Sequence, residues 1–320
     1  MKLNKLVIAM GFATAALVGC GSDAIAPTEN VNSITAIDGY IVKGDVTATC
    51  GEMEYTGVTD ASGIAKIDIV DSLITNCAVK IVGNENTYDH DKKDQPWKHT
   101  MRSLKGKRVI NPYTDMAATL ADDPANAGKS DKELMDGVIA LLGPDAANIV
   151  GDFDLFADFG SHSANSKVSQ QVRVLAESTF ATIIKMIESL GENDTPENRL
   201  AVFKTVLPQV TEAVSTQIAA VEAADGDLSE LVFTVDVAIP TLIIKEDGSV
   251  DTEKLADDLP QIVIETETRP EQPAPPAGVT PPPVVTPTPV VTPTPVVTPT
   301  PKPTGTGTGT GTGGDDVNQG

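Results

Sequence analysis

Apolar residues alternate with polar residues in several short runs between positions 35 and 82. A period of two is typical of β-strands that bury one face. Turn residues separate the runs, most clearly in Asp60-Ala61-Ser62-Gly63, where the Asp and the Gly suit turn geometry. We therefore expect a small β-sandwich, which we place at residues 35–113.

The hydrophobic period changes to that of helices between positions 115 and 225. Ser130 and Glu133 have the spacing of a capping box, which predicts the start of a first helix. Gly143-Pro144 is a stop signal, so this helix should end there.

Two longer helices are expected beyond it, one over about 166–190 and one that opens at Thr195-Pro196. Pro208 should kink the latter helix. Each helix has one apolar face, which predicts a compact helical bundle at residues 114–226. The alternative is that one of these faces forms a groove for a partner helix.

Residues 227–266 combine the two kinds of pattern. Three short apolar runs predict strands, Asp247-Gly248 predicts a turn, and the stretch 252–259 predicts a short helix; the runs lie at 231–233, 242–244 and 262–264. We expect a small β/α element that docks on the bundle.

The composition changes after Arg269, where proline, threonine and glycine dominate. The sequence VVTPTP repeats three times between positions 284 and 301, and Gly then alternates with Thr from 305 to 312. Proline fixes φ and removes a hydrogen-bond donor, so residues 267–320 are expected to form a disordered stalk. Either this stalk is itself the working part, or a downstream domain is missing.

The first residues have the pattern of an export signal. Lys2 and Lys5 precede an uncharged stretch at 6–18, which is too short to span a membrane. The following Leu17-Val18-Gly19-Cys20 resembles the lipobox of bacterial lipoproteins. The resemblance implies that residues 1–19 are removed, that Cys20 is lipidated, and that residues 20–34 form a tether. The alternative is an ordinary secretory signal with a chance Cys.

In Gram-negative lipoproteins an Asp after the lipidated Cys resembles an inner-membrane retention signal. This chain has Gly21 at that position. The resemblance therefore implies an outer-membrane location, on either the periplasmic or the surface side. Two acyl chains or more would give stable anchoring.

Cys50 and Cys77 are the two remaining cysteines. Export places them in an oxidising compartment, where a structural disulfide is the default interpretation. A metal site would require further ligands at suitable spacing, and a catalytic pair is more often CxxC.

Two stretches of the predicted β region, IDGYIVKGDVTATC and GVTDASGIAKIDI, resemble the carboxypeptidase-regulatory-like, transthyretin-like β-sandwich. The stretch INPYTDMAATL resembles an element that follows this module in some marine gammaproteobacterial lipoproteins, from which Tyr113 and Asp115 depart. The resemblance implies a fold and a secreted context but no activity. The matching positions are Asp38, Gly39, Tyr40, Gly44, Thr59, Asp60 and Gly63.

The chain has 320 residues, and its 45 acidic and 23 basic side chains give a net charge of -22. Phosphate binding requires a surplus of Lys and Arg, so nucleic acid is not expected as a partner. Aromatic residues make up only 4% of the chain, which argues against a large aromatic-lined cleft.

Candidate catalytic and metal-binding residues are few. His162 lies between two serines, without the sequence of a nucleophile elbow. Asp89, Asp91 and Asp94 form an acidic stretch that could bind Ca²⁺, although it lacks the Gly and the closing Glu of an EF-hand. We expect no enzyme, no cofactor and ordinary loop structure here; the alternative is a hydrolase that uses His162 or the acidic stretch.

The segment 92–108 is strongly basic and contains the only Trp. An exposed Trp beside cations could bind a sugar ring or an anionic polymer such as lipopolysaccharide or peptidoglycan. The alternative is a solvated loop whose charges balance the acidic bundle. The candidate ligand-binding residues of the loop 88–108 are Tyr88, Trp97, Lys98, His99 and Arg102.

Together these patterns predict an α+β protein with an N-terminal β-sandwich, a helical bundle and a C-terminal stalk. The expected function is that of a non-enzymatic, lipid-anchored outer-membrane protein with a structural or interaction role in adhesion or surface assembly. The alternative is a module that binds a glycan or an anionic envelope polymer through the loop 88–108.

Overall fold

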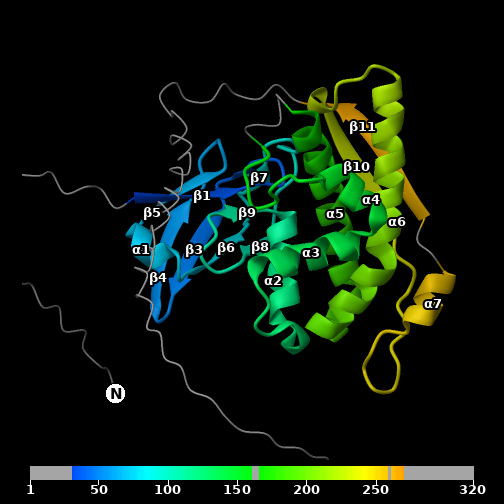
Figure 1. The fold of residues 1–320 in the computed structure, drawn as a ribbon, viewed down its shortest axis with the longest axis horizontal. Helices are drawn as coiled ribbons and strands as arrows, with labels where there is room; N and C mark the ends of the chain where they lie inside the picture. The colour runs from blue at the N-terminus through cyan, green and yellow to red at the C-terminus, as the bar shows by residue number, and fades with distance from the viewer. Residues whose placement is uncertain (1–30, 161–165, 259–260, 270–320) are drawn as a thin grey trace, which may run out of the picture. The chain divides into compact units, whose positions relative to one another are not determined.

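A computed structural model describes residues 31–160, 166–258 and 261–269. All of them belong to one compact unit. The described part is a mixed α+β fold in which β-sheets come first and helices follow, as predicted (Figure 1). The C-terminal part of the described chain forms a further two-stranded sheet.

The N-terminal strands form two larger sheets and one short pair. The first sheet has the order β5-β1-β9, with β1 antiparallel to β5 and parallel to β9. The second has the order β4-β3-β6-β8 and is antiparallel throughout, and β2 pairs with β7. The bounds are β1 Val31–Ala36, β2 Ile41–Val42, β3 Asp45–Cys50, β4 Met53–Val58, β5 Ile64–Asp68, β6 Ala78–Val82, β7 Tyr88–Asp89, β8 Thr100–Ser103 and β9 Val109–Ile110.

The alternating residues of these strands face a shared apolar core. Ile34 and Ile67 from the first sheet and Val79 and Ile81 from the second belong to one buried cluster. A disulfide joins Cys50 to Cys77 within this cluster, as the sequence predicted. A short helix, α1 (Asp71–Ile74), precedes Cys77. The period of two therefore identified the buried faces correctly.

Helices form the centre of the chain. Side chains cap α3, α5 and α6 at Ser130, Ser166 and Thr195, and the Ser130–Glu133 capping box is confirmed. Pro208 lies inside α6, which is one continuous helix. The α-helical bounds are α2 Pro112–Asp122, α3 Asp131–Leu142, α4 Pro144–Val150, α5 Lys167–Leu190, α6 Pro196–Ala223 and α7 Thr252–Asp257, with short 3-10 turns at Pro124–Asn126, Gly191–Asn193 and Leu228–Glu230.

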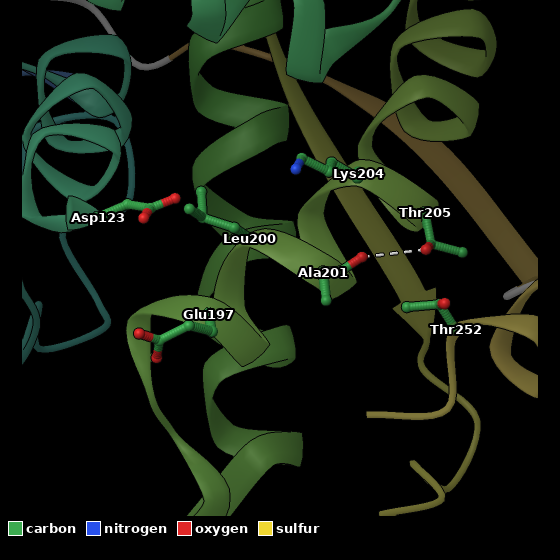
Figure 2. Close-up of a pocket in the computed structure, with 7 residues that line it drawn as sticks. All are labelled: Asp123, Glu197, Leu200, Ala201, Lys204, Thr205 and Thr252. Atoms are coloured by element: carbon green, nitrogen blue, oxygen red, sulfur yellow. Dashed lines mark hydrogen bonds between the residues drawn. The ribbon is translucent and has the colours of Figure 1, made fainter. Parts of the chain in front are cut away.

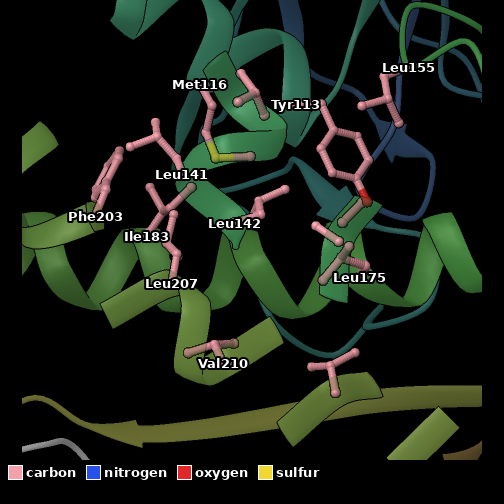
Figure 3. Close-up of a cluster of buried hydrophobic side chains, with 14 of the residues drawn as sticks. Tyr113, Met116, Leu141, Leu142, Leu155, Leu175, Ile183, Phe203, Leu207 and Val210 are labelled. Atoms are coloured by element: carbon pink, nitrogen blue, oxygen red, sulfur yellow. The ribbon is translucent and has the colours of Figure 1, made fainter. Parts of the chain in front are cut away.

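The apolar faces of these helices form a second core. Figure 3 shows side chains from α2, α3, α5 and α6 that point toward one another. Tyr113 lies at one side of the cluster, and its hydroxyl donates a hydrogen bond to the Val172 carbonyl (2.7 Å). The labelled members are Tyr113, Met116, Leu141, Leu142, Leu155, Leu175, Ile183, Phe203, Leu207 and Val210.

The C-terminal strands β10 (Leu231–Ala238) and β11 (Gln261–Thr268) pair antiparallel along their full length. β10 packs on α5, and β11 contacts α6. The prediction of a strand at 242–244 is wrong. Of these three residues, Ile244 alone makes a β-bridge, and its partner is Val250 across the Gly248 turn. The partner of β10 comes instead from beyond α7.

Candidate functional site

Several features of the predicted chain lie outside the described residues. They are the export signal at 1–19, the lipid-attachment candidate Cys20 with Gly21, the catalytic candidate His162 and the predicted stalk beyond Arg269. Within the residues that the structure describes, none of the helices combines the length and the apolar character that crossing a membrane requires.

Trp97 is buried, with 5% of its surface exposed. Its ring stacks on Phe180 of α5 at 6.0 Å between centroids and meets the edge of His99 at 5.6 Å. Its Nε1 donates a hydrogen bond to Asp38 Oδ2 (3.4 Å). The expectation of an exposed Trp is therefore wrong, because helix α5 supplies an aromatic neighbour that covers the ring.

Several cations of the basic segment are already paired with acidic residues elsewhere in the fold. The Nζ of Lys98 lies 2.6 Å from Glu85, and Arg102 donates from Nη1 to Asp122 of α2 at 2.7 Å. Tyr88 is half-buried, with Lys43 over its ring. Two further pairs have the same form, Lys107 with Asp131 and Arg108 with Asp71.

The five loop candidates therefore differ in burial and do not form one exposed binding surface. Trp97 is inside the fold, and half-buried His99 contacts it, with burial lowering the pKa of the His99 imidazole. The pairing pattern agrees with the alternative that the loop balances the acidic charge of neighbouring elements.

The three residues of the acidic stretch lie in different environments. Asp89 and Asp91 are buried, whereas Asp94 is exposed. Asp89 Oδ1 accepts a hydrogen bond from the main-chain nitrogen of Asp91 (2.9 Å), and Asp91 Oδ2 lies 3.0 Å from Arg269. In residues 31–160, 166–258 and 261–269, no three His, Cys, Asp or Glu side chains are grouped to hold a metal ion.

Asp89 and Asp91 belong instead to a buried cluster of charged side chains, which we name the junction cluster. Elements far apart in the sequence contribute to it. Its members are Asp38 from the turn before β2, Asp89, His90, Asp91 and Lys92 from β7 and the following turn, Arg173 and Glu177 from α5, and Arg269 after β11.

Ion pairs and main-chain contacts connect the members on helix α5. Arg173 is 1% exposed, its Nη2 donates to the Leu228 carbonyl (2.7 Å), and its Nε lies 3.8 Å from Glu177. Arg269 reaches the same Glu177 carboxylate at 3.1 Å. The i, i+4 spacing of Arg173 and Glu177 is the one signal in the sequence that could have indicated this pair.

The Asp38-Gly39-Tyr40 sequence forms one wall of the junction cluster. A Cβ on Gly39 would lie 2.0 Å from Asp89 Oδ1, so only glycine leaves room for that carboxylate. Tyr40 packs against Gly63 and Gly160, and its hydroxyl donates to Asp158 at 3.3 Å. Gly39 and Tyr40 are therefore packing residues.

Burial shifts the protonation of the junction cluster. Desolvation, and then the neighbouring Asp91 carboxylate, raises the pKa of Asp89 to about 7. Desolvation also raises the pKa of Asp38 and of Glu177 well above the usual values. The carboxylates around Lys92 raise its pKa despite its burial, so it remains charged. The arrangement can therefore hold a proton inside the fold near neutral pH.

The surface of the described residues includes two depressions that could hold a ligand. The larger, of about 410 Å³, lies over α6 and includes the acidic Asp123 and Glu197 beside Lys204 (Figure 2). The smaller, of about 240 Å³, lies where β6 and β8 meet α2, and three of its lining residues are basic, namely Lys80, Arg102 and Lys105. Its lining also includes Asp122, which pairs with Arg102.

No family model matches the chain, and no curated protein or solved structure matches it.

Proposed function

We propose that the chain is an exported, lipid-anchored protein of the bacterial outer membrane with a structural or interaction role. The observation that carries the proposal is the Cys50–Cys77 disulfide, a bond that is rare in reducing compartments. The lipobox-like Leu17-Val18-Gly19-Cys20 supports the same export route. Lipid on Cys20 would anchor the folded body by its N-terminal tether.

The body is proposed to include a β-sandwich of the carboxypeptidase-regulatory-like, transthyretin-like kind. Support comes from the two sheets that share one apolar core and from the residues that led to the resemblance. Gly39 lies against Asp89, and Asp60 accepts hydrogen bonds from the nitrogens of Ser62 and Ile64 in the turn before β5. Such a body serves as a scaffold for interactions rather than for a particular chemistry.

The stalk expected at 267–320 begins later than predicted, because residues 267 and 268 belong to strand β11. The Pro/Thr/Gly-rich stretch after Arg269 is proposed to be an extended stalk that reaches a partner in adhesion or surface assembly. At ~3.1 Å per residue, a polyproline II segment of about 35 residues extends ~110 Å. This reach would take the stalk well beyond the folded body.

The proposal is tested by detergent phase partition of cell extracts, followed by protease treatment of intact cells. The wild-type chain should enter the detergent phase, whereas Cys20→Ser should remain in the aqueous phase. An antibody against the VVTPTP repeat then reports which side of the outer membrane the stalk occupies. A wild-type chain that stays aqueous would contradict lipid anchoring.

A second proposal is that the body binds an anionic envelope polymer at the groove lined by Lys80, Arg102 and Lys105. The groove is the specific observation that favours it. Sugar stacking on Trp97 is no longer included, since that ring is buried. The double variant Lys80→Glu, Lys105→Glu should abolish co-sedimentation with peptidoglycan or lipopolysaccharide. Lys132→Glu, at an exposed position of α3 outside the groove, should not.

Equal co-sedimentation of the groove variant and the wild type would contradict this second proposal. It would leave lipid anchoring unaffected, because the anchor and the groove are separate features of the chain.

A further inference from the structure

The sheet β4-β3-β6-β8 has one face in an apolar core and a second face of different character. Val46, Val79 and Met101 belong to the buried cluster of the strands. The residues that alternate with them along β3, β6 and β8 are exposed or half-buried. These residues and their partners on β4 form a polar surface, which we name the outer face.

One row of side chains on the outer face crosses all four strands. Thr56 of β4 lies opposite Thr47 of β3. Thr47 in turn lies opposite Lys80 of β6, and Lys80 lies opposite Arg102 of β8. Neighbouring strands are about 4.8 Å apart, so the row is ~14 Å long. Two hydroxyls and two cations therefore follow one another across the sheet.

The cations of this row are in an unfavourable arrangement, because like charges directly opposite each other destabilise a sheet. Arg102 is paired with Asp122 of α2 at 2.7 Å. Lys80 and Lys105 have no ion pair among the described residues, unlike Lys107 and its neighbours in the basic segment. Both lysines line the groove of about 240 Å³ beside α2, in a chain with a net charge of -22. An anionic group bound in the groove would supply their missing counter-charge.

The surroundings of the row favour a ligand whose negative charges are widely spaced. Asp45 and Glu54 lie in neighbouring rows of the outer face, where they would repel a densely charged polymer. Arg102 is already paired, which disfavours the bidentate contacts by which arginine recognises phosphate. The hydroxyls of Thr47 and Thr56 can each donate and accept a hydrogen bond, which matches the hydroxyls of a neutral sugar.

We propose that this row and the groove together bind a linear glycan with spaced carboxylate groups, of the kind found in peptidoglycan. The glycan lies across the strands over Thr56 and Thr47, and a carboxylate occupies the groove beside Lys80 and Lys105. The assignment rests on the second proposal above, that the groove binds an anionic envelope polymer, and it selects peptidoglycan over lipopolysaccharide, which concentrates its charge in phosphate groups.

The first test measures binding of the full chain to purified peptidoglycan sacculi, with lipopolysaccharide micelles as the second probe. The wild type should bind sacculi more tightly than the micelles. Sacculi whose carboxyl groups have been amidated should bind at least tenfold more weakly, because a neutral amide forms no charge-assisted hydrogen bond with Lys80 or Lys105.

The second test removes the hydroxyls of the row. The double variant Thr47→Val, Thr56→Val keeps the branched shape that suits a strand, and its affinity for sacculi should fall about tenfold. The double variant Thr234→Val, Thr266→Val is the matched control, because these exposed threonines belong to β10 and β11, and it should bind as the wild type does. Thr56→Val alone, at an exposed position, should lose about threefold and provides the test if the double variant does not fold.

The outcomes separate this inference from the proposal on which it rests. Tighter binding of the wild type to lipopolysaccharide than to sacculi would overturn the inference and leave the anionic-polymer groove standing. A threonine variant that binds sacculi as the wild type does, while Lys80→Glu, Lys105→Glu does not bind them, would have the same meaning. Equal binding to native and amidated sacculi would overturn the recognition of carboxylates. A wild type that binds neither polymer would overturn both.

Discussion

Gly39 and Asp89 illustrate how a single residue position can be determined by a neighbour distant in the sequence. In the sequence, Gly39 stands out because Asp38-Gly39-Tyr40 resembles a family pattern. The structure supplies the physical reason, which is the Asp89 carboxylate at the place of a Cβ. Asp89 was considered as a calcium ligand, yet it is buried, and its Oδ1 accepts a hydrogen bond from the Asp91 nitrogen.

Gly39→Ala should therefore destabilise the fold. The added methyl group would collide with a buried carboxylate that cannot move freely, and overpacking of this kind costs about 1–3 kcal/mol. Chemical denaturation gives the change in the free energy of unfolding. Gly137→Ala in α3 is the control, because the only close atom there is a Leu120 methyl at 3.1 Å and alanine favours helix. Equal stability of the two variants would contradict the account of Gly39.

Trp97 should act as a core residue rather than as a ligand-binding residue. Trp97→Ala removes the stacking on Phe180 and the hydrogen bond to Asp38. The free energy of unfolding should therefore fall by about 3–5 kcal/mol. Trp97→Phe keeps an aromatic ring beside Phe180 and should cost less. Thermal denaturation compares the three proteins, and an alanine variant as stable as the wild type would show that the ring is not buried.

At the scale of elements, local signals located the helices well. Ser130, Thr195 and Gly191 mark ends of helices α3, α6 and α5 because caps and stops act within a few residues. The strand predicted at 242–244 does not form, and β10 pairs with β11 from beyond α7, because strand pairing is not local and several apolar runs were available. The junction cluster was missed for the same reason: Arg173 and Arg269 are neighbours only in the folded chain.

Helix α2 provides a test of one such local signal. Asn111 is fully buried; its side-chain oxygen accepts from the Thr114 nitrogen, and its Nδ2 donates to the Leu155 carbonyl (3.0 Å). Asn111→Ser keeps a capping oxygen but loses the donor, and Asn111→Ala loses both. The alanine variant should be less stable than the serine variant by about 1 kcal/mol in urea denaturation. The reverse order would contradict the capping role.

At the scale of the whole molecule, the disulfide links the stability of the body to its compartment. Cys50 and Cys77 are 27 positions apart, and closing a loop of this size stabilises a fold by about 3–4 kcal/mol in the chain-entropy model. The Cys50→Ser, Cys77→Ser double variant should unfold at correspondingly lower denaturant concentration. A reducing agent should lower the wild-type midpoint similarly and leave the variant unchanged; a wild type insensitive to reduction would contradict the bond's stabilising role.

The central claim is that this chain is an exported lipoprotein, and labelling with a palmitate analogue in a bacterial host tests it most directly. The account predicts that the wild-type chain incorporates the label and that Cys20→Ser does not. The Cys50→Ser, Cys77→Ser variant should still be labelled, because its lipid site is intact. Absence of label from the wild type, or label that persists in Cys20→Ser, would contradict the account.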